Sequence, residues 1–230
     1  VPADVAWSDG GSVAALPTLP QPPLPTAKSI ERAAGMLRSG LQTAILLAGN
    51  ALYGEGLAAA GRIASATGAK LFAPYPLTRL QRGAGLPPVE RVAYVIEQGI
   101  DQFKDFRQLI LVGAVAPIAY FAYPGKTSNF VSPECEIHVL AKPSEDRVGS
   151  LIALGEALSL TEKQSSLQTA SRPALPDGHI TLPGLAAVIG ALLPENSIVV
   201  EESMTSGRGM MAASKGARPR VCIGNTAGSI

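Results

Sequence analysis

The strongest constraint on the fold of this chain is a set of short, unbroken apolar runs separated by helical segments. Four such runs occur before residue 160, at residues 43–48, 70–73, 108–112 and 137–140. Apolar runs without polar alternation are typical of strands that are covered on both faces. Because strands and helices alternate along the chain, right-handed βαβ crossovers are expected. The sequence therefore predicts an α/β fold: a Rossmann-like parallel sheet with helices on both faces.

The helices that connect these runs are predicted from apolar periodicity and from capping residues. The first is expected from Ser29, as N-cap, to about Arg38, and the second over residues 55–67 with its end at Gly68. Later helices are predicted at residues 89–103 and 146–158. We expect a loop around Arg79 and Arg82, and an irregular segment over residues 114–133.

Composition narrows the class of protein. Apolar residues make up 47% of the chain, charged residues 16% and aromatic residues only 5%, which predicts a sizeable core of Ala, Leu, Val and Ile. The formal net charge of +1 gives no electrostatic reason to expect a nucleic-acid or membrane-surface partner. No apolar run is long enough to cross a bilayer. Two distant cysteines, Cys135 and Cys222, fit a reducing compartment, so a cytoplasmic location is predicted.

Shifts in composition divide the chain into four parts. Residues 1–27 combine a short N-terminal segment, expected to end an upstream domain, with a proline-rich linker. Residues 28–160 form the Rossmann-like domain, and residues 161–180 a polar second linker. Residues 181–230 begin a second α/β unit, with helices near 182–193 and 207–215 and strands near 197–200 and 220–223, which we expect to be incomplete. The sequence thus predicts a piece of a larger protein.

One candidate ligand site follows the first buried strand. Residues 49–56 (GNALYGEG) lie between a strand and a helix, where Rossmann-like folds bind phosphates on free backbone N–H groups. The loop does not match G-x-G-x-x-G. Pro74 and Tyr75 stand where an acidic residue would hold a ribose. The residues therefore favour a structural turn over a dinucleotide site.

Other polar residues give weaker signals. Arg79 and Arg82 are candidates to bind an anion, although solvated loop arginines are the more common case. His138 and His179 lack partners at motif spacing, and structural roles are favoured. Glu201 and Glu202 are adjacent in extended chain, so their side chains should point to opposite faces rather than form an acid/base pair. No metal-ligand cluster is evident.

The C-terminal part carries the more informative pattern. Ser203, Thr205 and Ser206 follow one predicted strand, and a second loop of small residues, 225–230 (NTAGSI), follows the next. Two such loops at one sheet edge are typical of a crevice for a phosphorylated ligand. On the residues alone, a ligand crevice and a purely structural pair of loops remain equally open.

The order and spacing of several segments resemble a known family. These segments are residues 1–8 (VPADVAWS), 82–91 (RGAGLPPVER), 111–117 (LVGAVAP), 202–206 (ESMTS) and 228–230 (GSI). Together they resemble the thiamine-diphosphate (ThDP) enzymes of the acetolactate synthase and benzoylformate decarboxylase type, and above all proteins described as acetolactate synthase large subunit-like. The resemblance covers nearly the whole chain. It implies the last strand of a pyrimidine-binding domain at residues 1–8, the central domain, and the opening of a diphosphate-binding domain.

The resemblance also implies site residues. Ser203, Met204, Thr205 and Ser206 match the loop that contacts the cofactor diphosphate. Gly228 matches the residue whose carbonyl accepts a hydrogen bond from the 4′-amino group, and Ile230 the apolar residue that holds the cofactor bent. The family's catalytic glutamate would lie before Val1, and its Mg²⁺-binding segment after Ile230. No catalytic or metal-binding residue is therefore expected in this chain.

The implied function is that of a scaffold. The parent protein would be a ThDP- and Mg²⁺-dependent lyase or transferase that decarboxylates or joins 2-keto acids, and the chain alone would be inactive. Its implied partners are the other domains of the same protein, in a homodimer or homotetramer. Some relatives bind FAD in the central domain, but the loop at Gly49 does not match that use. A stand-alone FAD- or nucleotide-binding module and a ligand-free interaction domain remain alternatives.

Overall fold

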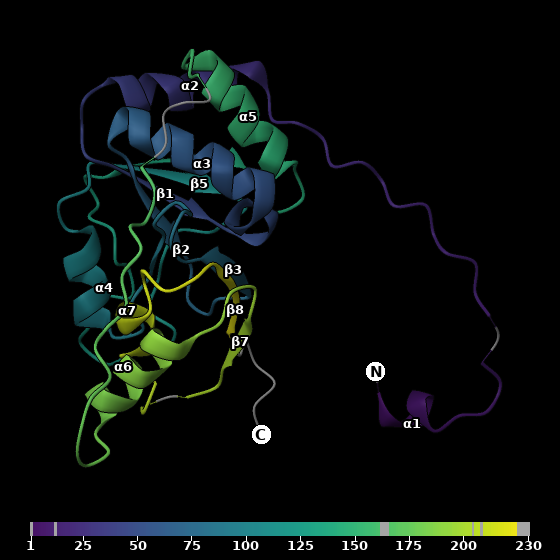
Figure 1. Ribbon diagram of the computed structural model, residues 1–230. Helices are drawn as coiled ribbons and strands as arrows, with labels where there is room; N and C mark the ends of the chain where they lie inside the picture. The colour runs from purple at the N-terminus through teal and green to yellow at the C-terminus, as the bar shows by residue number, and fades with distance from the viewer. Residues whose placement is uncertain (1, 12, 162–165, 204, 208, 225–230) are drawn as a thin grey trace.

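The computed structural model describes residues 2–11, 13–161, 166–203, 205–207 and 209–224. Figure 1 shows a sheet covered by helices, a smaller sheet below it, and an N-terminal segment that runs away from both. The larger sheet is built entirely from parallel pairs and the smaller one is mixed. The predicted α/β class, a parallel sheet with helices on both faces and a second α/β unit, is confirmed.

The larger sheet has five strands in the order β4-β2-β1-β5-β6. They are β1 (Thr43–Leu47), β2 (Lys70–Ala73), β4 (Glu90–Arg91), β5 (Gln108–Val112) and β6 (Glu136–Ala141). Every residue of β1 and β5 is buried, as the unbroken apolar runs predicted. Because the chain moves from β1 toward one edge and later from β5 toward the other, the switch point lies between these two strands.

One face of this sheet is covered by three helices with purely aliphatic contacts. These are α2 (Ala27–Arg38), α3 (Gly54–Thr67) and α5 (Arg147–Ala157). They pack on Ile45 and Leu47 of β1, and on Ile110 and Val112 of β5. Since alternate residues of a strand point to opposite faces, the remaining side chains of the same strands are left for the other face. This side of the core is the Ala, Leu, Val and Ile packing that the composition predicted.

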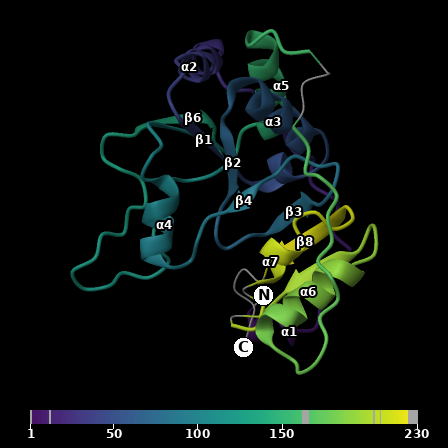
Figure 2. The same ribbon diagram turned by 60° about the vertical axis from the view of Figure 1, so that its left-hand side comes forward.

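The opposite face is aromatic, which the low aromatic content did not predict. Helix α4 (Ile96–Phe103) covers it together with the segments on either side of β5, and Figure 2 shows α4 on the side of the sheet away from α3 and α5. Phe72, Phe103, Phe106 and Phe130 all lie here. The Phe72 and Phe103 rings lie 4.8 Å apart between centroids. Four of the five phenylalanines thus lie on one face. Their large side chains fill the core there, beside the single helix α4.

Capping residues fix the ends of the helices. Asp146 accepts hydrogen bonds from the amides of Val148 and Gly149 at the start of α5, and Gly68 ends α3 in the left-handed conformation, as predicted. The N-cap of α2 was predicted wrongly. It is Thr26 rather than Ser29, because the Thr26 hydroxyl accepts the Ser29 amide one turn earlier.

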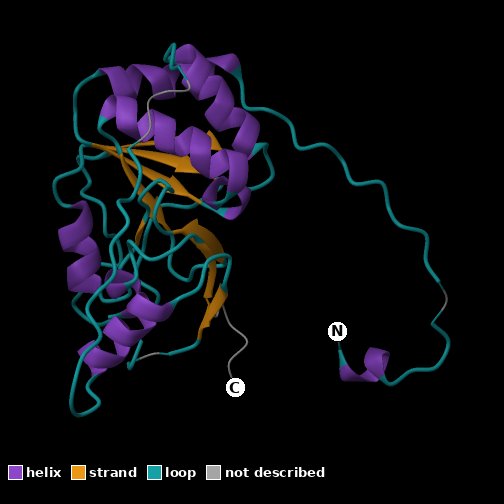
Figure 3. Cartoon of the chain, viewed as in Figure 1, coloured by secondary structure: helices purple, strands orange, loops and turns teal. Residues whose placement is uncertain are grey.

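The smaller sheet has the order β3-β8-β7, and Figure 3 shows it as a separate group of strands below the larger sheet. It consists of β3 (Arg79–Arg82), β7 (Ile198–Glu201) and β8 (Arg220–Gly224). Strands β7 and β8 are parallel, and β3 pairs antiparallel with β8. Helix α6 (Leu182–Leu192) agrees with the helix predicted near residues 182–193 and has Thr181 as its N-cap, while α7 (Met210–Ala213) is shorter than the predicted helix at residues 207–215.

Two predictions between residues 77 and 103 were wrong. The segment around Arg79 and Arg82 is strand β3 and not a loop, since its backbone pairs with β8. The predicted helix at residues 89–103 begins only at Ile96, because Glu90 and Arg91 form β4 beside Phe72 and Ala73 of β2. In both places a distant strand supplies hydrogen bonds that local periodicity does not reveal.

The N-terminal segment was also predicted wrongly. Residues 3–6 form a single helical turn, α1 (Ala3–Ala6), rather than a strand. Figure 1 shows α1 at the end of an extended segment, and Trp7 is 89% exposed. None of the strands in the described part of the chain pairs with residues 3–6, so their hydrogen bonds are made locally, from Ala6 to Pro2 and from Trp7 to Ala3. Across the described residues, no helix combines the length and apolar character that crossing a bilayer requires.

The aromatic face provides a test of the core. We expect Phe103→Ala to lower the free energy of unfolding by about 3–5 kcal/mol, because a fully buried ring is removed from contact with Phe72 and Phe106. Phe121→Ala is the matched control, since Phe121 is 52% exposed and should cost less than about 1 kcal/mol. Urea unfolding followed by fluorescence measures both. Equal effects of the two substitutions would contradict this account of the core.

Candidate functional site

The loop after β7 holds the described part of the predicted ligand site. Ser203, Thr205 and Ser206 follow the carboxyl end of β7, and all three are exposed. Gly207 is buried beneath this loop, and a Cβ there would overlap the Ser203 hydroxyl. A side chain at position 207 would therefore displace Ser203. The other predicted site residues, Met204, Gly228 and Ile230, lie outside the described residues.

The two loops predicted to form one crevice begin side by side. Strands β7 and β8 are parallel and in register, with Val200 beside Ile223 and Glu201 beside Gly224. The ends of β7 and β8, after which the two predicted loops follow in sequence, therefore lie side by side at one sheet edge. Hydroxyl groups at the carboxyl ends of parallel strands are suited to phosphate oxygens, so the described donors fit a diphosphate group.

A layer of charged side chains lies on the smaller sheet, and one ion pair in this layer reaches the larger sheet. Arg91 of β4 forms an ion pair with Glu201 of β7 at 2.9 Å, and the two side chains are 27% and 11% exposed. Arg82 of β3 donates to the sulfur of Met211, and Arg220 of β8 donates to the carbonyl and hydroxyl oxygens of Ser214. Burial lowers the pKa of Arg82 to about 10, which leaves the guanidinium charged near neutral pH.

Sequence reasoning missed this layer. Arg82 was considered only as a loop residue, and Arg91 was placed in a helix. The predicted divergence of Glu201 and Glu202 does follow from the strand, since Glu201 points to Arg91 and Glu202 is exposed. One signal in the sequence could have indicated this layer: its charged residues stand in short segments flanked by apolar residues. Such a pattern predicts that the charged side chains are partly buried, but it does not predict which residues they pair with.

Cys222 lies within the same layer. It is 4% exposed, and burial raises the pKa of its thiol, which outweighs the opposing effect of the nearby Arg220 and Arg82 guanidinium groups. Cys135, beside the aromatic face, is 7% exposed and its pKa is raised mainly by burial as well. Both thiols are therefore protonated near neutral pH, and neither is an activated nucleophile.

The loop after β1, the candidate nucleotide site, is filled by an arginine. Residues 49–52 form a short 3₁₀ helix, η1 (Gly49–Leu52), and the Arg147 Nε donates to the Asn50 side chain at 2.8 Å. A Cβ on Gly49 would lie 2.7 Å from the Arg147 guanidinium, and one on Gly113 would overlap the Arg147 Cδ. Both glycines have positive φ. The space beside them at the switch point is occupied by the chain's own side chain, which favours the structural turn.

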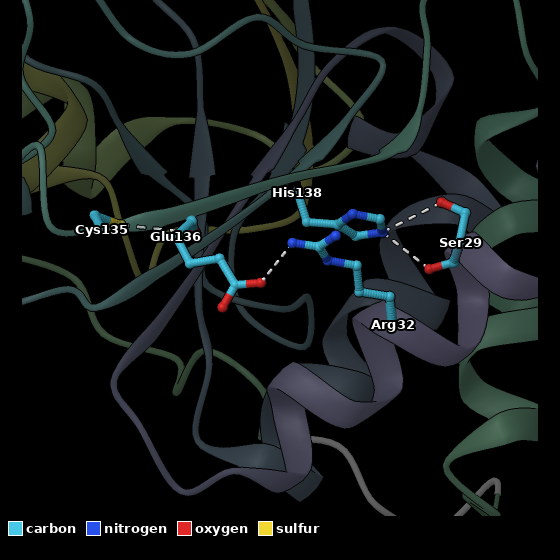
Figure 4. Close-up of polar contacts among 5 residues, drawn as sticks. All are labelled: Ser29, Arg32, Cys135, Glu136 and His138. Atoms are coloured by element: carbon cyan, nitrogen blue, oxygen red, sulfur yellow. Dashed lines mark hydrogen bonds and ion pairs between the residues drawn. The ribbon is translucent and has the colours of Figure 1, made fainter.

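His138 has a structural position, as the sequence favoured. Figure 4 shows its ring directed from β6 toward the first turn of α2. The His138 Nε2 lies 2.9 Å from the Ser29 carbonyl oxygen and 3.2 Å from the Ser29 hydroxyl. The exposed ion pair of Arg32 with Glu136 joins the same two elements at 2.9 Å. These contacts hold α2 against the edge strand and lie away from the β7 loop.

A shallow aromatic hollow lies near the carboxyl ends of β1 and β2. Tyr75, Tyr94 and Tyr120 line it, with pairwise ring distances of 5.1–6.2 Å, together with apolar residues such as Leu46 and Pro117. No charged side chain lines this hollow among the described residues. Within the same residues, no group of three or more His, Cys, Asp or Glu is placed to bind a metal ion.

Comparisons with known proteins identify relatives of this chain and other proteins that share its fold. No family model matches the chain. Over all 230 residues the chain is 42% identical to a Mycobacterium tuberculosis protein described as "Putative acetolactate synthase large subunit IlvX", of which it spans 44%. The benzoylformate decarboxylase of Polynucleobacter necessarius shares the fold with a TM-score of 0.64 at 14% identity, over 96% of this chain and 44% of its own.

A ThDP-dependent 4-hydroxybenzoylformate decarboxylase from Rhodococcus jostii RHA1 gives a similar match, with a TM-score of 0.62 at 14% identity over 98% of this chain and 44% of its own. The fold is therefore one that occurs within ThDP-dependent enzymes. The sequence relationship is narrower: this chain is similar throughout to less than half of an acetolactate synthase large subunit-like protein. The resemblance noted in the sequence is confirmed.

The thiols provide a test of this arrangement. At pH 8 we expect both cysteines to react with a disulfide reagent at least about a hundred times more slowly in the folded chain than in denaturant, because burial keeps them protonated and shielded. The stability that each protonated thiol contributes is complete below its ordinary pKa, near 9, and is lost as the pH rises through the raised value.

Absorbance of the released reagent measures the rate, and the variants Cys135→Ala and Cys222→Ala assign it to each thiol. Rapid stoichiometric labelling of either cysteine in the folded chain would contradict the burial described for it.

Proposed function

We propose that this chain is the central domain, with flanking segments, of a ThDP-dependent 2-keto-acid decarboxylase or carboligase of the acetolactate synthase type. The observation that carries the proposal is the 42% identity over all 230 residues to the acetolactate synthase large subunit-like protein. The shared fold with two decarboxylases supports it. The chain spans 44% of that relative, and we propose that within the longer parent protein it serves as a scaffold.

When bound, ThDP would supply the nucleophilic carbon and the electron sink for cleavage beside the keto group. The part of this chain is to hold that cofactor. The Ser203, Thr205 and Ser206 hydroxyls would donate to diphosphate oxygens, and the Gly207 backbone leaves space for Ser203 to do so. Met204 would contact the same group, the Gly228 carbonyl would accept from the 4′-amino group, and Ile230 would support the bent cofactor.

The remaining parts of the proposal concern the parent protein. Its other domains would supply the catalytic glutamate and the Mg²⁺ ligands, and they would be the main partners of this chain. The parent would act in the cytoplasm on a small 2-keto acid, as a homodimer or homotetramer. The division at residues 1–27, 28–160, 161–180 and 181–230 belongs to the same proposal.

Two backbone contacts bear on that division. The 161–180 segment pairs with both neighbouring units, through hydrogen bonds between Gln168 and Leu86 and between Ser171 and Gly216. This segment would therefore be an attached connector between the two units. FAD at the Gly49 loop is not favoured, since Arg147 occupies the space beside Gly49.

Turnover by the full-length parent and by this chain tests the proposal. With ThDP, Mg²⁺ and a panel of 2-keto acids that includes pyruvate and benzoylformate, we expect the parent to release CO₂ and this chain to release none above the buffer rate. The reason is that the diphosphate donors of this chain need the pyrimidine-binding domain and the metal ligands of the parent. Turnover by the chain alone, or a folded parent inactive on the whole panel, would refute the proposal.

The diphosphate donors provide a second test. In the parent protein, Ser203→Ala should raise the dissociation constant of ThDP about tenfold, which corresponds to roughly 1.4 kcal/mol for one hydrogen bond to a charged group. Ser197→Ala is the matched control, because Ser197 lies before β7, at its opposite end, and its hydroxyl donates to the Pro194 carbonyl. Titration calorimetry measures both affinities. An unchanged affinity in Ser203→Ala would exclude that residue from the site.

A further inference from the structure

One segment of the larger unit contacts the starting points of both proposed cofactor loops. Residues 77–91, here called the bracing segment, run from the end of β2 through β3 to β4. At the end of β8, the Gly224 amide donates to the Leu77 carbonyl at 3.1 Å. At the end of β7, Glu201 pairs with Arg91 at 2.9 Å. The two positions from which the loops leave the smaller sheet are thus both tied to this segment.

The bracing segment is itself firmly attached to both sheets. Its β3 pairs with β8 over four residues, from Arg79 with Ile223 to Arg82 with Arg220. Beyond β3, the Ala84 amide donates to the Ala217 carbonyl at 2.9 Å, and a Cβ on Gly83 would lie 2.7 Å from the Arg218 carbonyl oxygen. At its other end, Arg91 lies beside Ala73 in the larger sheet. A shift of the larger sheet would therefore be transmitted to β7 and β8.

The ion pair is the polar side-chain contact between these sheets that is closest in sequence to the Ser203 loop. Glu201 is the last residue of β7, and its side chain is 11% exposed. Among the described residues, Arg82 and Cys222 also lie near Glu201, and the Arg91 guanidinium lies 5.9 Å from the centre of the Tyr75 ring. Arg220 is directed to Ser214 and Arg82 to Met211, so Arg91 is the described group that pairs with the carboxylate.

We infer that Arg91 is a positioning residue which, through Glu201 and the bracing segment, fixes the loop that binds the ThDP diphosphate. This inference rests on the proposed function and extends it, because it gives the central domain a direct part in forming the cofactor site. Without Arg91, the carboxylate of Glu201 loses its partner in a site with little access to water, and it must turn toward solvent. Glu202 and Ser203 follow Glu201 directly along the chain, so they would move with it.

The test compares variants of the full-length parent protein. Arg91→Ala and Glu201→Gln each break the ion pair, and Arg91→Lys retains the charge without the guanidinium geometry. Arg107→Ala is the matched control, since Arg107 forms an ion pair of the same length, 2.9 Å, with Glu134 on the exposed surface. For each protein, hydrogen exchange of residues 202–207 is measured without cofactor, and ThDP affinity is measured by calorimetry at saturating Mg²⁺.

We expect Arg91→Ala and Glu201→Gln to accelerate exchange at residues 202–207 and to weaken ThDP binding about tenfold, with a smaller loss in Arg91→Lys. Arg107→Ala should stay within about twofold of the unchanged protein in both measurements. The effect of the double variant should equal that of either single variant, because the two residues act as one pair. If Arg91→Ala does not fold, the isosteric Glu201→Gln decides the result.

Hydrogen exchange tests whether Arg91 positions the loop, and ThDP affinity tests whether that loop binds the cofactor. Unchanged exchange in Arg91→Ala and Glu201→Gln would overturn the inference, whatever the affinity. Faster exchange with unchanged ThDP affinity would overturn the role of Arg91 in cofactor binding, and it would also count against the placement of the diphosphate at residues 203–206. Hydrogen exchange that is faster throughout the protein, and not at residues 202–207 in particular, would indicate a general loss of stability. That result would also overturn the inference that Arg91 positions this loop.

Discussion

Burial of β1 and β5 on both faces is the constraint on which the rest of the structure depends. All their residues are buried, so helices or loops must cover each face of the sheet. Aliphatic helices meet this requirement on one side, and a cluster of phenylalanines under a single short helix meets it on the other. The carboxyl ends of these strands are then held at one edge, where Arg147 fills the space between the glycines that follow β1 and β5.

The pairing of β3 with β8 changes how the two units relate to each other. A strand from the larger unit completes the smaller sheet, so backbone hydrogen bonds join the two units. Backbone hydrogen bonds at a sheet edge are directional and fix register, unlike a contact between two side-chain surfaces. The scaffold role proposed for the central domain therefore includes part of the framework from which the candidate cofactor loops emerge.

The sequence predicted those elements whose own residues show a local pattern, such as an apolar run or a helix-ending glycine. The buried runs at β1, β2 and β5 and the end of α3 at Gly68 are local features, and they were located well. Strands β3 and β4 were missed because RLQR and ER have neither apolar runs nor alternation, and distant partners make them strands. The same limit applies to the site. Ser203, Thr205 and Ser206 were proposed from their chemistry and remain a prediction, whereas the Arg91–Glu201 pair required knowledge of which strands meet.

The charge balance of the charged layer on the smaller sheet agrees with an anionic ligand nearby. Arg82 lies near Arg91, Arg220 and Glu201, and burial lowers the pKa of Arg82 to about 10 and also lowers the pKa of Arg220. Charges that are partly removed from water act over longer distances than exposed ones, because screening is weaker there. Positive charge near the end of β7 would therefore favour a diphosphate at Ser203, Thr205 and Ser206, as proposed above. The same residues that join the two sheets would then set both the position and the electrostatic potential of the proposed site.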